Sequence, residues 1–413
     1  MIKGELIKGQ SVKKLLCYLI TTVVAAIVFY PLFYRQCIIL HGGDYMDHNG
    51  FVEPILNGSY KTMYPGYQWI VGYSAKVFGT GIDITSVAIL TICMIVCIFV
   101  TYYILGILAD DNKISVIRMM TAFIINMVQP IFTGSIRPGY SSVNGYISPT
   151  QIVCKPAVYG ALAVFFSILT KDDKGKGNIK NRLILTFLLI VSCIIKPLFA
   201  MAFVPAMGLY YFVDVLRKKL SVSGFIKEYV CRIYPLFITG LFLIGQYIYL
   251  DKFSTAKYEQ WDGGSIALGF MVSWKSVVPN VPLSIVFAYF FPIVIGGICL
   301  IRRKTIGKSQ LTERENAWLG TSLWYGLVSF IYMAFLYQTN GHEQDCNFRN
   351  AWIFTFYMIF MVFTEVLIRW IKEAGISIKK PQIKENVHIY ISLMAFGVHV
   401  LFGVALLYNK IFM

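Results

Sequence analysis

Acidic and imidazole side chains gather in a short stretch that follows the first apolar run of the chain. Asp44, Asp47, His48 and Glu53 lie close together there. Because Asp44 and Asp47 are three residues apart, they would share one face of a helix. A partly desolvated carboxylate near a lipid surface could accept a proton from a substrate hydroxyl. The pattern indicates a general base, and the alternative interpretation is an acidic, solvated loop.

Cationic residues that could bind a phosphate precede or interrupt later apolar runs. Arginine suits this task because its fork of donors matches phosphate oxygens. Lys196 lies inside an apolar stretch, where a lysine usually has a partner or a task, although it could also snorkel to the interface. The N-terminus of a helix that starts beside Arg349 would add to the attraction for a phosphate, whereas Glu343 could instead be its structural partner. The candidates are Arg137, Lys155, Lys196 and Arg349, with Glu343 as a further substrate contact.

The elements that position these residues must be membrane helices. Of 413 residues, 57% are hydrophobic and 14% are charged, whereas soluble domains have about 45–50% apolar and about 25% charged residues. This composition excludes an ordinary water-soluble enzyme and a disordered chain. The net charge of +16 does not indicate nucleic-acid binding, because the basic residues lie in short tracts between apolar runs. The sequence predicts an all-α, polytopic bundle, and we expect residues 1–413 to form a single integral membrane domain.

Apolar stretches near the length of about 20 residues that a bilayer requires recur along the chain. The stretch 183–214 is interrupted by Lys196-Pro197 and Pro205, so it is expected to form two short helices that meet near the outer face. These two bring the predicted total to eleven membrane segments. The others are 15–34, 84–108, 118–135, 156–170, 233–250, 282–301, 317–338, 350–370 and 388–408.

The segment 64–79 decides the topology. If it crosses the membrane, a basic tract at 171–182 falls outside. If it is instead an amphipathic surface helix, most of the 37 Lys and Arg residues fall on the inner side, as the positive-inside rule requires. We therefore expect a cytoplasmic N-terminus, an outer C-terminus and a large first outer loop over 36–83. The first apolar run is expected to be retained as a membrane anchor.

The first outer loop resembles the opening of the GT-C superfamily of membrane glycosyltransferases. The resemblance rests on Asp44-Tyr45 and His48, then ILNGSY at 55–60 and YPGYQWI at 64–70. By its offset from Gly58, Asp44 best matches the catalytic acidic residue of that family, and Asp47 is the second choice. Where many members have a paired acidic dipeptide, this chain has Tyr45 beside Asp44.

The resemblance implies a transferase that takes a sugar from a polyprenyl-phosphate carrier on the outer side. The aspartate would deprotonate the acceptor hydroxyl of a cell-envelope glycan or lipid, and cationic groups would stabilise the departing phosphate. The expected partners are this donor, the acceptor and membrane lipid, with no nucleic acid. No cofactor is predicted with certainty, and a divalent metal is left open.

Two other classes compete with this interpretation. A transporter or flippase of a lipid-linked saccharide would use the same cations without a base, and it should have polar residues deep in several spans. A polysaccharide polymerase or ligase would use paired arginines in outer loops, which are scarce here. The Ile- and Lys-rich composition favours a bacterial plasma membrane as the location.

Overall fold

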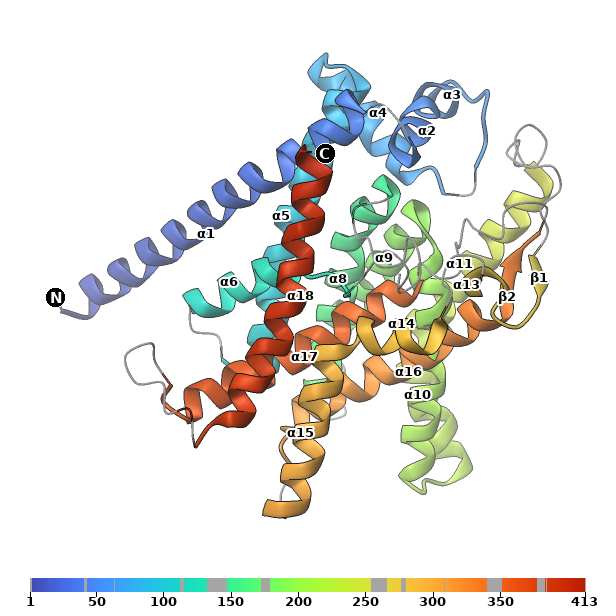
Figure 1. Cartoon of the computed structure of the whole chain (residues 1–413). Coiled ribbons are helices and arrows are strands. Elements are labelled where there is room, and N and C mark those ends of the chain that lie inside the picture. The colour runs from blue at the N-terminus through green and yellow to red at the C-terminus, as the bar shows by residue number, and fades with distance from the viewer. Residues whose placement is uncertain are drawn as a thin grey trace.

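The chain folds as an all-α membrane bundle with one short, two-stranded antiparallel sheet (Figure 1). The computed structural model describes residues 2–40, 43–62, 64–111, 115–131, 146, 148–171, 179–253, 266–275, 280–307, 309–339, 351–376, 383 and 385–412. Predicted site residues Arg137, Glu343 and Arg349 lie outside the described residues.

Long helices form the body of the bundle. They are α1 (Ile2–Tyr34), which continues as the π-helical turn η1 (Arg35–Ile39), α5 (Ile82–Leu108), α6 (Val116–Ile125), α8 (Pro149–Lys171), α9 (Ile179–Ile195), α10 (Leu198–Arg217), α11 (Val222–Phe253), α15 (Phe290–Ile306), α16 (Glu313–Phe335), α17 (Trp352–Glu373) and α18 (Val387–Phe412). The shorter elements are α2 (Asp44–Gly50), α3 (Val52–Leu56), α4 (Gly66–Phe78), α13 (Val272–Lys275), α14 (Val281–Ala288) and the antiparallel strands β1 (Ile266–Leu268) and β2 (Leu336–Gln338).

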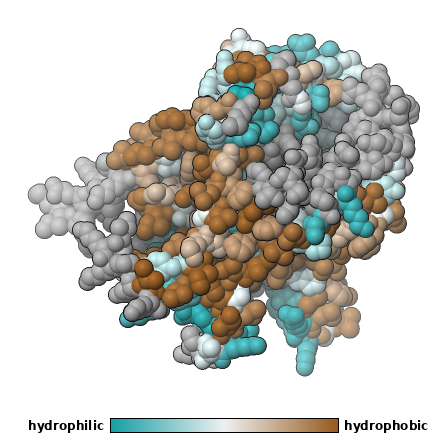
Figure 2. Space-filling view, viewed as in Figure 1, coloured by the Kyte–Doolittle hydropathy of each residue, from teal (hydrophilic) through white to brown (hydrophobic). Residues whose placement is uncertain are grey.

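Eight helices in the described part of the chain are long and apolar enough to cross a membrane, and the bent pair α14–α15 makes nine if it is one span. Apolar side chains cover the middle of the visible surface, while hydrophilic ones gather towards its two ends (Figure 2). Exposed leucine, isoleucine and valine side chains are frequent along α1 and α11. Because such a surface is unfavourable in water, this is an integral membrane protein.

The predicted count of eleven segments is not confirmed, and two predicted boundaries are wrong. The helix expected over 118–135 is α6, which ends at Ile125, and the chain at 128–131 is not helical. The helix expected over 156–170 begins at Pro149 instead, with Pro156 inside it. A proline is tolerated there because neighbouring groups in a membrane bundle can satisfy the freed carbonyl.

Two helix breaks shape the bundle. The predicted interruption at Lys196-Pro197 is confirmed, since α9 ends at Ile195 and α10 begins at Leu198, but the one expected at Pro205 is wrong, because this proline lies inside α10. The stretch expected to span 282–301 is bent by 72° between α14 and α15. His399 of α18 supports this second break, because its Nε2 accepts a hydrogen bond of 3.3 Å from the backbone N–H of Phe291. Its Nδ1 donates to the Gln129 carbonyl at 2.8 Å.

Helix α17 lies at the centre of the packing, with buried side chains on all its faces. It contacts α5, α6, α15, α16 and α18. The indole N–H of Trp318 in α16 donates to the Met358 carbonyl at 2.7 Å, and the Tyr325 hydroxyl donates to the Ala351 carbonyl at 2.6 Å. These bonds fix α16 against α17 along several turns.

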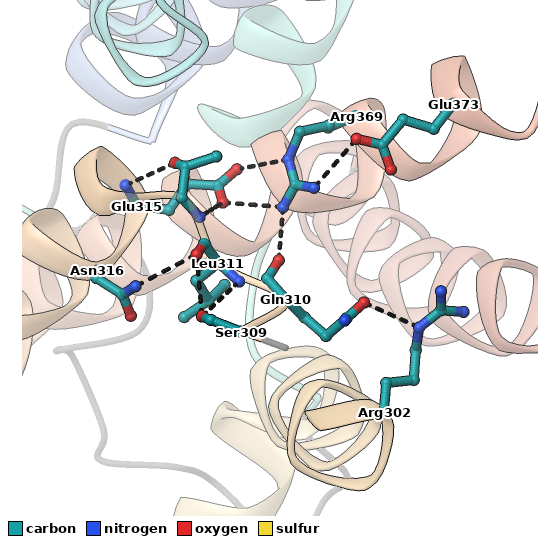
Figure 3. A network of polar contacts seen from close by, with 9 residues as sticks. Arg302, Ser309, Gln310, Leu311, Glu315, Asn316, Arg369 and Glu373 are labelled. Carbon is teal, nitrogen blue, oxygen red and sulfur yellow. Dashed lines mark hydrogen bonds and ion pairs between the residues drawn. The ribbon is translucent and has the colours of Figure 1, made fainter. Parts of the chain in front are cut away.

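Ionic contacts join the carboxyl-terminal end of α17 to its neighbours (Figure 3). The Arg369 guanidinium donates to both carboxylate oxygens of Glu315, at 3.2 and 2.9 Å, and to the Gln310 carbonyl at 2.7 Å. Nearby, the fully buried Arg118 of α6 lies 3.7 Å from the Glu365 carboxylate. These contacts hold the turn before α16 and the start of α6 against α17.

The short helices α2–α4 form one end of the molecule, next to the carboxyl-terminal end of α18 (Figure 1). Residue 66 must be glycine where α4 meets α9, because a Cβ atom there would lie 2.8 Å from Ile195 and 2.9 Å from the Ile194 carbonyl oxygen. The helix predicted at 64–79 is α4. The absence of a side chain at Gly66 lets it pack directly on the end of α9.

Candidate functional site

Asp44 and His48 lie on one face of α2. The carboxylate oxygen of Asp44 lies 3.9 Å from Nε2 of His48, one helical turn further along the chain. The Asp44 side chain is 46% exposed and that of His48 is 20% exposed. Asp44 therefore has access to a substrate, while the imidazole beside it is largely enclosed.

His48 is neutral at pH 7. The pKa of its imidazole is lowered from 6.5 to about 4, chiefly because the group is buried. The negative charge of Asp44 raises this pKa, and the positive charge of Lys196 lowers it further. The side-chain amide of Gln68 in α4 donates to Nδ1 of His48 at 3.2 Å. That bond leaves the imidazole proton on Nε2, the atom that faces Asp44.

Lys196 lies at the break between α9 and α10, within electrostatic reach of Asp44 and His48. Its ammonium donates to the Ser148 hydroxyl at 3.2 Å and to the Thr150 hydroxyl at 3.3 Å. Both hydroxyls belong to the start of α8, and they bond to each other at 2.9 Å. Lys196 is thus held towards the site by two buried hydroxyls.

A small pocket lies beside Lys196, where the ends of several helices meet. Its accessible wall is apolar, although Lys196 and Gln151 border it. The lining residues are Gln151, Cys154, Lys196, Leu198, Phe199 and Phe354.

Three of the predicted site residues thus lie close together: Asp44, His48 and Lys196. Asp47 and Glu53 are exposed to solvent instead. Lys155 is 1% exposed and lies under aromatic rings instead, with its ammonium 4.9 Å from the ring centre of Tyr357. It belongs to the interior of the bundle, one turn beyond Gln151 on α8.

Sequence reasoning missed the residues that support this cluster. Asn49 directly follows His48 in α2, Gln68 lies in α4, and Ser148, Thr150 and Gln151 lie at the start of α8. The sequence contains one usable signal, Ser148-Pro149, because a serine before a proline is a common helix start. That signal would have moved the beginning of this helix from 156 to 149.

In the part of the chain that the structure describes, no three His, Cys, Asp or Glu side chains are grouped so that they could hold a metal ion. No family model matches the chain, and no curated protein is significantly similar to it.

Proposed function

We propose that this protein is a membrane glycosyltransferase that moves a sugar from a polyprenyl-phosphate carrier to a glycan or lipid acceptor. The observation that carries the proposal is the accessible carboxylate of Asp44 beside a neutral His48, with Lys196 close by. The Asp44 carboxylate is 46% exposed, so the hydroxyl of a substrate can reach it and give it a proton.

The chemistry that suits this arrangement is a single displacement. Asp44 accepts the proton of an acceptor hydroxyl, and the oxygen attacks the anomeric carbon of the sugar. The bond between that carbon and the phosphate oxygen breaks, and the electron pair leaves with the lipid phosphate. Lys196 stabilises the negative charge that develops on this leaving group. The configuration at the anomeric carbon is inverted.

We also propose that the site faces outward from a bacterial plasma membrane. Basic residues at the α10–α11 turn and at the end of α15 lie far from α2–α4 (Figure 1), as expected if that end is cytoplasmic. The end of α18 lies beside η1, where Arg35 donates to the Ile411 carbonyl at 3.0 Å. The C-terminus then shares the outer side with the site.

The test is an assay in proteoliposomes with a panel of radiolabelled polyprenyl-phosphate sugars and a crude envelope acceptor. Asp44→Asn removes the base and keeps the shape of the side chain, so transfer of label is expected to fall to the background level. Asp47→Asn is the matched control, and it is expected to retain transfer. Full activity of the Asp44→Asn protein would contradict the mechanism.

A transporter of a lipid-linked saccharide is the second candidate. Buried polar side chains occur in several helices, including Lys155 in α8, Gln246 in α11 and His399 in α18. Such groups are expected along the path of a polar substrate through a membrane. Movement of the intact labelled carrier across the vesicle membrane, with no cleavage, would support this candidate over the transferase.

A further inference from the structure

The turn between α10 and α11 projects from the bundle at the end opposite α2–α4 (Figure 1). Aromatic contacts hold the two helices together there. The ring centre of Phe212 lies 5.6 Å from that of Phe225 and 5.8 Å from that of Tyr229. The Tyr229 hydroxyl also donates to the Gly208 carbonyl at 3.3 Å. The side chains around this turn therefore form one surface with a defined arrangement.

Basic residues outnumber acidic ones on this surface. The Arg232 guanidinium lies 2.8 Å from Asp214 and 2.8 Å from Glu228, and the Lys218 ammonium lies 2.5 Å from Glu228. The two carboxylates are thus occupied by two of the basic groups. Three more basic side chains are exposed and form no ion pair among the described residues: Arg217, Lys219 and Lys227. The surface therefore presents an excess of positive charge.

The backbone at Lys219 is a second unusual feature of this turn. Its φ is 50°, in the left-handed region where the residue that follows a helix is commonly glycine. Other residues avoid this region because their Cβ approaches the following carbonyl oxygen. The chain has a charged residue at a position that glycine would occupy with less strain, and strained residues of this kind cluster at functional positions.

Exposed apolar side chains lie among the charges. In the first turns of α11, Val222, Ile226 and Val230 are each more than half exposed, and their spacing of four residues places them along one face of the helix. We call these three residues the apolar stripe. Leu216 and Leu220 of the same turn are exposed as well. Basic and apolar side chains side by side suit the boundary between lipid headgroups and acyl chains.

The length of α11 places the apolar stripe at this boundary. The helix has 32 residues and is about 48 Å long at 1.5 Å per residue, whereas the hydrocarbon core of a bilayer is about 30 Å thick. The stretch expected to cross the core is 233–250. The turns before it, 222–232, therefore lie at the level of the headgroups.

We infer that the α10–α11 turn binds the headgroups of anionic phospholipids through its three exposed basic residues, while the apolar stripe enters the adjoining acyl region. Clusters of Lys and Arg directly beside a membrane helix attract such headgroups. A lipid fits this surface better than a soluble anion does, because the apolar stripe requires a hydrophobic partner. The turn lies far from Asp44, so the inference does not rest on the proposed transferase activity.

The test is native mass spectrometry of the full-length protein in detergent, titrated with phosphatidylglycerol or with zwitterionic phosphatidylcholine. Phosphatidylglycerol is expected to bind at least tenfold more tightly. Arg217→Gln, Lys219→Gln and Lys227→Gln should each weaken its binding about fivefold, and the triple variant about a hundredfold. The affinity for phosphatidylcholine should not change. Equal affinity of the wild-type protein for the two lipids would overturn the inference.

A matched triple variant removes the same amount of charge elsewhere at this end of the molecule. It combines Arg303→Gln, Lys304→Gln and Lys372→Gln, which are exposed positions at the ends of α15 and α17. This protein is expected to bind phosphatidylglycerol like the wild type. An equal loss of affinity in the two triple variants would contradict the inference, because the attraction would then depend on net charge and not on the α10–α11 turn.

Two further measurements separate binding from folding and a lipid from a soluble anion. Lys219→Gly removes a charge and suits the left-handed backbone, so its melting temperature should be unchanged or higher while its affinity for phosphatidylglycerol falls about fivefold. Wild-type affinity in this variant would exclude Lys219 from the binding surface. Glycerol phosphate, the soluble headgroup analogue, should fail to displace phosphatidylglycerol. Displacement at equal concentration would overturn the assignment to a lipid.

Discussion

The hydroxyl of Tyr67 donates a hydrogen bond of 2.6 Å to the side-chain oxygen of Asn49, and the Ser86 hydroxyl donates to the same oxygen at 2.9 Å. The Asn49 amide in turn donates to Asp83 at 2.7 Å. Asn49 follows His48 in α2, and Tyr67 precedes Gln68 in α4. These bonds therefore fix both partners of the His48–Gln68 contact against α5.

Tyr67→Phe is expected to loosen this arrangement. It removes the donor and leaves the buried oxygen of Asn49 with one bond fewer, which should lower the free energy of unfolding by about 1–3 kcal/mol. The measurement is chemical or thermal unfolding of the purified protein in detergent. Tyr73→Phe, at a position of α4 that is 58% exposed, is the control. Equal stability of the two variants would mean that the bonds to Asn49 contribute nothing.

Acid should destabilise the protein through His48. Because the folded-state pKa of about 4 lies below the unfolded value of 6.5, the neutral imidazole contributes stability that is fully present above pH 6.5. That stability is lost as the pH falls towards 4, and the shift corresponds to about 3 kcal/mol at most. Melting curves between pH 7 and pH 4 should show a smaller decline for His48→Gln. Parallel declines in both proteins would assign the acid sensitivity to other groups.

A cysteine at position 74 should report the side of the membrane on which α4 lies. In a background without reactive native cysteines, Ser74→Cys is expected to react with an impermeant maleimide added outside intact cells. Ser221→Cys, in the α10–α11 turn, should react only after permeabilisation. The reverse pattern would invert the proposed orientation of the whole chain.

Replacing only one member of the buried Arg118–Glu365 pair should lower the free energy of unfolding. Glu365→Met removes the buried counter-charge of the Arg118 guanidinium and leaves it beside the more exposed Asp111, at 3.6 Å, so a loss of about 3–5 kcal/mol in unfolding free energy is expected. The double variant Arg118→Met, Glu365→Met should lose less than the sum of the two single changes. Additive losses would show that the two residues act independently.

Features that depend on residues close together in the sequence were predictable. The break at Lys196-Pro197 follows from proline chemistry, and α4 follows from the pattern of 64–79, because both depend on nearby residues. Their spacing of three predicted that Asp44 and Asp47 share one helix face, whereas the residue beside the Asp44 carboxylate is His48, four residues later.

Features that depend on distant contacts were not predictable from one sequence. Nothing in the surroundings of Gln151 indicates that its amide would be enclosed by α10 and α17, and Lys155 resembled the other outer cations although it lies under Tyr357. The bend between α14 and α15 depends on His399, more than a hundred residues later in the chain. Such residues acquire their roles only when the helices pack.

Because α17 has protein on all its faces while the described side chains of α1 and α11 include many exposed apolar ones, substitutions should accumulate in these helices at very different rates. Exchanges between leucine, isoleucine and valine on α1 change little, whereas a residue of α17 has several packing partners at once. Distant relatives of this chain should therefore be recognised first by the α17 segment, together with the glycine at position 66.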